Sequence, residues 1–340
     1  MEKVILKSLL KSFMKMVGFV EESFHIPVML KEVIDFFFLS PQELMERYFS
    51  KKRILLAIKE IPEIFVDATA GGGGHLFSII NYYKTFFPKN FKTAIFIGLD
   101  VDKEAIEYLE KKKIKLGLNN LFIHWENYLN IRELFSAFYP QKKPCRILFD
   151  LGISYYQAKS ALRGFSYDSN GIIDMRFDQI RQTKKALDLI RELNLNKLKE
   201  ILKKFGEEVN AERIAKKIFQ QKKEIKTTYD LKRIVLSVSG KKSIPRVFQA
   251  FRIFVNNELE NLKTGLKEAF LLLKNEGRLA VITYHSLEDR IVKNSFNLWE
   301  KEKKGRKLTP KPIVASFGEI ENNRAARSGK LRVFLKYEEN

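Results

Sequence analysis

Residues 64–83, IFVDATAGGGGHLFSIINYY, decide the fold of this chain. The first three residues form an apolar β-type run that Asp67 ends, four glycines follow at 71–74, and residues 76–83 have a helical pattern. Glycine lets a ligand approach the backbone closely, and the amino end of the following helix offers unpaired N–H donors. This strand, loop and helix therefore predict a nucleotide-type site.

The residues around the glycines narrow the choice of ligand. A phosphate-binding GxxxxGK[ST] loop needs a lysine where this chain has His75-Leu76, and a dinucleotide GxGxxG loop needs a glycine where it has Leu76 or Phe77. The next apolar run ends in Asp100, a position from which an acid commonly accepts hydrogen bonds from ribose hydroxyls. Together these features favour S-adenosylmethionine, whereas the glycines alone would also suit a plain flexible turn.

Short apolar runs alternate with helical patterns along most of the chain. The expected strands cover residues 64–66, 94–100, 121–125, 146–150, 278–283 and 331–337. The expected helices include residues 31–38, 76–83, 103–113, 131–138, 246–274 and 287–299. This alternation predicts an α/β protein with a doubly wound, Rossmann-like parallel sheet, in which ligands bind at the carboxyl ends of the strands.

The pattern becomes mostly helical and strongly basic in the middle of the chain. The formal net charge is +21, and residues 159–246 hold 22 Lys plus Arg against 11 Asp plus Glu. We therefore predict a discontinuous sheet domain at 1–158 and 249–340 and an inserted basic helical domain at 159–248. Such an excess favours a polyanionic partner, nucleic acid before an anionic membrane surface, and a solvated lysine face is the alternative.

The remaining composition excludes several classes of protein. Cys145 is the single cysteine, which rules out a disulfide framework and a cysteine-rich zinc site and favours a reducing, cytoplasmic compartment; we predict no metal centre. No run of eighteen apolar residues exists, so no membrane insertion is expected. Residues 1–20 have the pattern of an amphipathic packing or tail helix. The oligomeric state, a homodimer included, is left open.

Eight ordered motifs resemble those of the ribosomal RNA small-subunit methyltransferase H family. The matching stretches are HIPVMLKEVIDFF (25–37), VDATAGGGGH (66–75), FIGLDVDKEAI (96–106), ILFDLGIS (147–154), GFSYDSNGIIDMRFD (164–178), FRIFVNNELENL (251–262), YHSLEDRIVK (284–293) and NNRAARSGKLRV (322–333). The resemblance implies an enzyme that uses S-adenosylmethionine to methylate N4 of a cytidine in small-subunit ribosomal RNA, as RNA or in the 30S particle. It also implies that the inserted helical domain helps to recognise the RNA.

Residue by residue, the resemblance implies a cofactor site on residues from three of these stretches and on two residues outside them. They are Gly73, Gly74, His75, Asp100, Tyr128, Asp150 and Gln157. The family usually has SSPQ where this chain has Ser154-Tyr155-Tyr156-Gln157, so the proline of that turn is absent.

For catalysis, we predict that Asp150, or the backbone carbonyls beside it, receives the N4 hydrogens of the target cytidine, because acceptors on these hydrogens localise the nitrogen lone pair. Asp174 and His285 are further candidates. An ion pair with Arg176 or a helix cap is the alternative for Asp174, and a structural role is the alternative for His285.

Other contacts and other functions stay open at this point. Arg163, Arg176 and Arg252 are expected to hold phosphates beside the target nucleotide. A methyltransferase acting on a small molecule or a DNA amine would use the same sheet, and a ribosome assembly factor without activity would keep the basic insertion.

Overall fold

The computed structural model describes residues 27–49 and 63–337, which form two compact units. The helical unit comprises Val101–Lys103 and Gly152–Thr264, and the sheet unit comprises the other described residues. The helical unit begins earlier and ends later than the predicted 159–248, because the turn after β4 and the start of α14 pack with it. The helix predicted at residues 1–20 lies outside the described residues. Within the described ranges, no helix is both long enough and apolar enough to span a bilayer.

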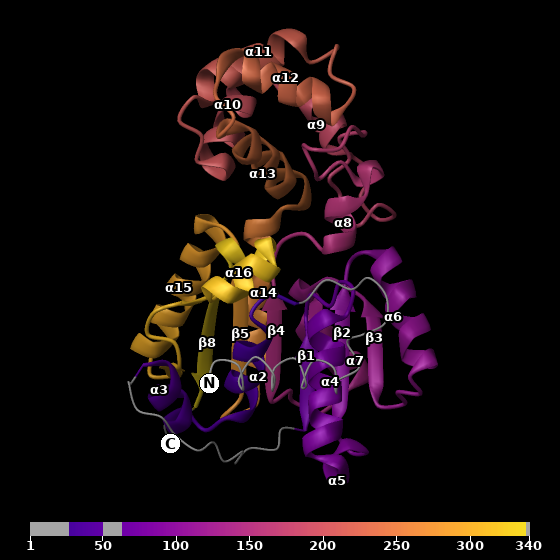
Figure 1. Ribbon diagram of the computed structural model, residues 1–340, viewed down its shortest axis with the longest axis vertical. Helices are drawn as coiled ribbons and strands as arrows, with labels where there is room; N and C mark the ends of the chain where they lie inside the picture. The colour runs from indigo at the N-terminus through magenta and orange to yellow at the C-terminus, as the bar shows by residue number, and fades with distance from the viewer. Residues whose placement is uncertain (1–26, 50–62, 338–340) are drawn as a thin grey trace. The chain divides into compact units, whose positions relative to one another are not determined.

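The sheet unit is built on one sheet with the strand order β3-β2-β1-β4-β5-β8-β6, and β7 pairs with β8 (Figure 1). The strands are β1 (Ile64–Asp67), β2 (Ile95–Asp100), β3 (Leu121–Trp125), β4 (Arg146–Asp150), β5 (Arg278–Thr283), β6 (Gly305–Lys307), β7 (Ile313–Val314) and β8 (Lys330–Lys336). Strands β1 to β5 are parallel, whereas β8 runs antiparallel to β5. The predicted α/β doubly wound class is confirmed.

Helices cover both faces of this sheet, as Figure 1 shows for α4 and α14. The helices of the sheet unit are α2 (Leu30–Phe38), α3 (Pro41–Tyr48), α4 (Gly74–Phe86), α5 (Pro88–Phe91), α6 (Lys103–Lys115), α7 (Ile131–Phe138), α15 (Ser286–Lys301) and α16 (Phe317–Asn322). Aromatic rings fill the layer below α4: Phe65 stacks on Phe96 of the neighbouring strand at 5.2 Å and meets Tyr83 edge-on at 5.6 Å. This packing fixes α4, and with it the glycine loop, on the sheet.

The helical unit has a hydrophobic core of its own. Its helices are α8 (Tyr155–Lys159), α9 (Ala186–Glu192), α10 (Leu195–Gly206), α11 (Ala211–Gln221), α12 (Thr228–Val238) and α13 (Ser243–Asn256). Apolar residues recur every three or four positions in α10 and α11, and Leu198, Ile201, Ile214 and Ile218 are completely or almost completely buried. The charged residues between them lie on the opposite, solvent-facing sides of these two helices.

The single helix predicted at 246–274 is wrong, because the chain forms α13 and then α14 (Glu258–Leu272). Asn257 ends α13 in the left-handed conformation, with φ of 50°. The amide of the preceding Asn256 donates to the Arg252 carbonyl of its own helix at 2.9 Å, and it also bonds outside the helix, accepting from the Phe177 N–H at 2.8 Å and donating to the Met175 carbonyl at 2.7 Å. Asparagine tolerates this backbone conformation, so the pair ends one helix where the apolar periodicity continues.

Two buried arginines at the amino ends of β4 and β5 anchor α2. The Arg278 guanidinium, fully buried, donates to the Phe36 carbonyl at 2.7 Å and to the Leu39 carbonyl at 2.6 Å. Arg146 donates to the Phe37 carbonyl at 2.7 Å. The last carbonyls of a helix have no partner within the helix, so these cations satisfy acceptors that burial would otherwise leave unpaired.

Replacing Arg278 with methionine keeps an unbranched side chain but removes the donors to both carbonyls. We expect the free energy of unfolding to fall by about 2–4 kcal/mol, because two buried acceptors lose their partner. Urea denaturation measures the change. Arg306→Met, at an exposed position of β6, is the matched control and should cost less than about 0.5 kcal/mol. Equal losses in the two variants would contradict the anchoring role.

Candidate functional site

The glycine loop joins β1 to α4 at the carboxyl edge of the parallel strands. Gly71 and Gly73 have φ of 49° and 77°, a region that favours glycine. A Cβ on Gly73 would lie 2.4 Å from the Phe77 ring and 2.6 Å from a Leu109 methyl. The loop is therefore wrapped tightly against its own helix and α6, and its backbone, not side chains, faces the ligand side.

Asp100 ends β2 next to this loop. Its Oδ2 accepts a hydrogen bond from the Gly71 N–H at 2.7 Å, and the residue is half-buried. β1 and β2 pair in parallel, so their carboxyl ends lie side by side. The structure thus brings together the loop and the acid that the sequence predicted as a ribose ligand.

Asp150 ends β4, on the other side of β1, and contacts two further side chains. Its Oδ2 lies 3.4 Å from Nδ1 of His75, in the first turn of α4. Its Oδ1 accepts from the Tyr284 hydroxyl at 2.7 Å. Tyr284 follows β5 directly and was not predicted as a site residue. Its position after an expected strand, at the start of the YHSLEDRIVK motif, was the signal that could have found it.

A third carboxylate, Asp67, lies at the end of β1 between the other two strands. Burial raises the pKa of Asp67 to about 7, although the charge of His75 and the Thr69 N–H lower it. Burial lowers the pKa of His75, but its hydrogen bond to Asp150 and the charges of Asp150 and Asp67 outweigh this, and the net pKa is raised. This edge therefore has an excess of acceptors and negative charge, which suits a ligand with cationic groups and disfavours pyrophosphate.

Tyr128 begins the short 3-10 helix Tyr128–Asn130 after β3. Its ring meets Phe149 of β4 edge-on, with centroids 5.2 Å apart. A Cβ on Gly265 would lie 2.4 Å from the Tyr128 ring, so the ring is packed between β4 and α14. The half-buried ring is thus held rigidly beside the central strands.

Gln157 belongs to the helical unit and is buried. It forms a capping box with Ser154, so the turn is made without the proline that the family usually has. Its Nε2 donates to Asp102 Oδ2 at 2.8 Å, and Arg163 donates to the same oxygen at 2.7 Å. These bonds join the segment after β2 to the segment after β4.

Asp174 and His285 make the contacts expected of their structural alternatives. Asp174 forms a bidentate ion pair with Arg176, at 2.7 and 2.8 Å, and is buried. Burial raises the pKa of Asp174, but the hydrogen bonds from Arg176 outweigh it and the net pKa is lowered. His285 caps α15 with Glu288, its Nδ1 accepting from the Glu288 N–H at 3.4 Å. These contacts favour structural roles for both residues.

The arginines expected to hold phosphates are engaged inside the helical unit. Arg163 is 2% exposed and Arg176 is 8% exposed, so the prediction that they contact RNA is wrong for both. Arg252 donates to both carboxylate oxygens of Glu258 at 2.9 Å. The Asp174 partner of Arg176 had been considered from the sequence, whereas Asp102 for Arg163 and Glu258 for Arg252 had not.

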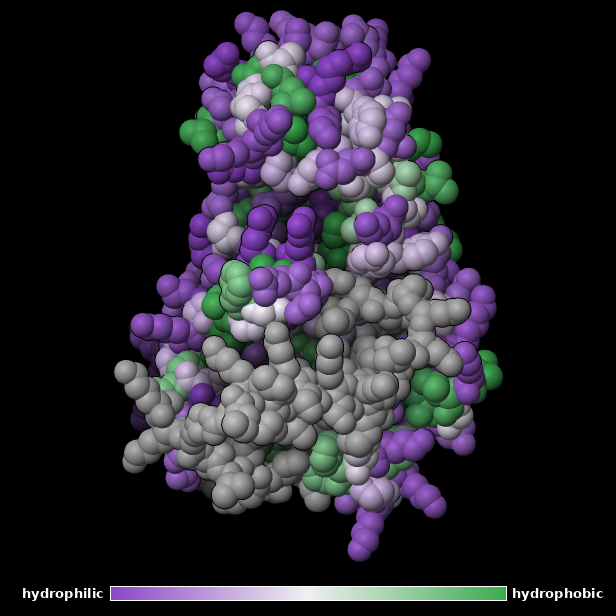
Figure 2. Space-filling view, viewed as in Figure 1, coloured by the Kyte–Doolittle hydropathy of each residue, from purple (hydrophilic) through white to green (hydrophobic). Residues whose placement is uncertain are grey.

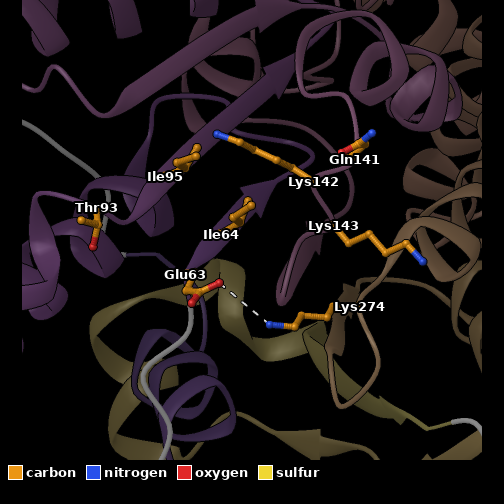
Figure 3. A pocket seen from close by; sticks show the side chains of 8 residues that line it. All are labelled: Glu63, Ile64, Thr93, Ile95, Gln141, Lys142, Lys143 and Lys274. Carbon is orange, nitrogen blue, oxygen red and sulfur yellow. Dashed lines mark ion pairs between the residues drawn. The ribbon is translucent and has the colours of Figure 1, made fainter.

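A hollow of about 480 Å³ lies at the opposite, amino-terminal edge of the sheet (Figure 3). It is lined by Glu63, Ile64, Thr93, Ile95, Gln141, Lys142, Lys143 and Lys274. Figure 3 shows the Lys274 ammonium turned toward Glu63, 3.9 Å away, while Lys143 points elsewhere. Ligands of parallel α/β sheets bind at the carboxyl edge, so this hollow is not the candidate site.

Comparisons with known proteins agree on one family. Residues 22–337 match the MraW methylase family. A ribosomal RNA small subunit methyltransferase H of Coprothermobacter proteolyticus is 43% identical, over 80% of this chain and 89% of the relative. Proteins of the same name from Caldicellulosiruptor saccharolyticus and Persephonella marina are 35% and 36% identical, over 92% and 91% of this chain and 99% and 98% of theirs.

Replacing Gly73 with alanine should distort the loop. We expect the free energy of unfolding to fall by about 2–4 kcal/mol, because the backbone conformation and the contacts with Phe77 and Leu109 both oppose a methyl group. Gly117→Ala is the matched control, because Gly117 also has a positive φ, 62°, but open space around it. That control should lose about 1 kcal/mol. Equal losses in urea denaturation would refute the role of the contacts.

Proposed function

This chain belongs to the MraW methylase family, and on that premise we propose that it methylates N4 of a cytidine in small-subunit ribosomal RNA. It is a methyltransferase. The proposal is carried by one observation: the glycine loop, Asp100 and Asp150 converge at the carboxyl edge of the sheet, in a chain 43% identical to a relative named for this substrate class. A ribosomal RNA substrate also agrees with a cytoplasmic location.

The side chains of this edge fit S-adenosylmethionine. That molecule carries positive charge on its sulfonium and α-amino groups, and Asp67, Asp100 and Asp150 offer acceptors and negative charge. Asp100 would hold the ribose hydroxyls, and the backbone at Gly73 and Gly74 allows close approach. When bound, the cofactor supplies an electrophilic methyl group.

Four other residues complete the proposed site. Tyr128 would present its ring beside β4, and His75 and Asp150 would lie near the reacting groups. Gln157 is proposed as a cofactor residue on the family resemblance, and its buried bond to Asp102 shows how the segment that follows Asp150 is held in shape. Asp174 and His285 are retained as supporting residues and not as groups that touch the substrate.

The amino group of cytosine is a weak nucleophile, because its lone pair is delocalised into the ring. Asp150 is half-buried at the end of β4, where a carboxylate can accept hydrogen bonds from the N4 hydrogens. Such bonds localise the lone pair on nitrogen and orient it toward the methyl group. The target cytidine must leave its stack to reach this depth.

The helical unit is proposed to recognise the RNA. The paired lysines Lys203-Lys204 and Lys241-Lys242 are exposed, and hydrophilic residues cover most of the visible surface over α10 to α12 (Figure 2). Lys204 lies over the ring of Phe205, which is half-buried, with 5.2 Å between the ammonium and the ring centroid. The surface therefore suits contact with phosphates, which positions RNA without selecting its sequence.

Labelled methyl transfer to small-subunit particles that lack the modification, followed by mass spectrometry of the nucleosides, tests the proposed function. We expect N4-methylated cytidine. Asp100→Asn should weaken S-adenosylmethionine binding by about 10- to 100-fold, because hydrogen bonds to a charged acceptor contribute about 1.5–3 kcal/mol. Transfer to duplex DNA or to a small amine, with none to RNA or particles, would replace the proposal by one of its alternatives.

Neutralising Lys203 and Lys204 as glutamines should weaken RNA binding. In a plot of the logarithm of affinity against the logarithm of salt concentration, the slope should become shallower by about one to two, since each phosphate contact contributes about 0.9 to it. Lys111→Gln with Lys115→Gln, two exposed positions of α6, is the matched control. Filter binding at several salt concentrations measures the slopes, and equal effects of the two double variants would remove the helical unit from RNA recognition.

A further inference from the structure

The Asp150 carboxylate is held from two sides, by His75 and by Tyr284, and the proposed function leaves Tyr284 without a role. Tyr284 donates its hydroxyl to Oδ1 at 2.7 Å, and His75 Nδ1 lies 3.4 Å from Oδ2. The backbone N–H of Asp150 donates to Thr69 Oγ1 at 2.7 Å. These contacts come from the end of β5, from α4 and from the glycine loop, so the carboxylate has one orientation.

Both ring nitrogens of His75 face oxygen atoms. Nε2 lies 3.0 Å from the Val28 carbonyl, which can only accept, and Nδ1 faces the Asp150 carboxylate. Each nitrogen therefore carries a hydrogen, which makes the ring an imidazolium. The raised pKa of His75 agrees with this geometry, because the hydrogen bond and charge of Asp150 outweigh the effect of burial.

Tyr284 is a donor at every pH in which the protein operates. Burial, followed by the charge of Asp150, raises the pKa of Tyr284 well above its usual value of 10. Tyr284 directly follows the last residue of β5, and its backbone N–H donates to Glu288 Oε2 at 2.9 Å. The residue is thus held at its backbone by Glu288 and at its hydroxyl by Asp150.

We propose that Tyr284 is a positioning residue for methyl transfer, which together with the His75 imidazolium holds Asp150 as a charge-neutralised hydrogen-bond acceptor instead of a proton acceptor. The inference rests on the proposed function. Two donors hold the carboxylate, while each of its oxygens keeps a further lone pair for an N4 hydrogen. Because the carboxylate is held in one orientation, its remaining lone pairs point in fixed directions and orient the amino group of the cytidine.

The proton balance then differs from general-base catalysis. The N4 lone pair forms the new carbon–nitrogen bond as the bond between methyl carbon and sulfur breaks, and that electron pair stays on sulfur. The methylated nitrogen has one proton too many, and this proton leaves to water. Asp150 is ionised before and after the step, and the imidazolium balances its charge throughout.

Several other titratable groups face this arrangement and contribute to its pH dependence. They are Asp67 at the end of β1, Asp100 at the end of β2, Glu288 of α15 and Glu319 of α16. Glu319 accepts from the Met29 N–H at 2.6 Å, and burial raises its pKa.

Tyr284→Phe keeps the ring and removes the hydroxyl. We expect kcat for particle methylation to fall by about 10- to 100-fold with KM for the particle nearly unchanged, because acceptor alignment matters in the transition state. A kcat within about twofold of wild type, or a fall in kcat accompanied by an equal rise in KM for the particle, overturns the proposal.

Tyr83→Phe is the matched control. Tyr83 is a buried tyrosine of the same unit, 1% exposed on α4, and the same hydroxyl is removed there. It should leave both kcat and KM for the particle unchanged. If the wild-type protein methylates no RNA, the proposed function fails, and nitrogen NMR of His75, assigned by comparison with His75→Gln, decides the inference. Two protonated ring nitrogens at pH 8 would support the charge arrangement, and a single tautomer would overturn it.

Discussion

Parallel pairing of β1 with β2 on one side and with β4 on the other forces three carboxylates to one edge of the sheet. Asp67, Asp100 and Asp150 each end a strand, so their mutual repulsion is a constraint that the rest of the site must meet. The protein meets it with local donors: the Gly71 N–H for Asp100, the Thr69 N–H for Asp67, and Tyr284 and His75 for Asp150. Two of these four donors, the Gly71 and Thr69 N–H groups, come from the turn between β1 and α4.

The two units present surfaces of opposite charge. The carboxyl edge of the sheet gathers acids around one histidine and suits a cationic cofactor, while the helical unit gathers exposed lysines on α10 and before α13. Phosphates would be repelled from the first surface and attracted to the second. A chain that must bind both a sulfonium compound and a polyanion is served by keeping these surfaces on separate hydrophobic cores.

The sequence was informative wherever short-range patterns decide the structure. The predicted strands at 121–125, 146–150 and 278–283 have the same bounds as β3, β4 and β5, because apolar runs between turns specify buried strands. The loop and Asp100 were predicted for the same reason. Long-range partners were not: Tyr284 and Asp150 are 134 positions apart, and Arg278 and Phe36 are 242 apart. Likewise, the break at Asn257 depends on the bonds that Asn256 makes to Met175 and Phe177, which periodicity cannot show.

Because the sheet unit is made from separate stretches of the chain, its parts leave the ribosome at different times during synthesis. The helical unit is nearly contiguous and has its own core, so it can fold while β5 and β8 are still unmade. β8 then enters between β5 and β6 and pairs with both, near the end of the chain. Tyr284 and the neighbouring strands thus reach Asp150 last, and a nascent chain acquires its acidic edge long before it acquires the tyrosine that orients it.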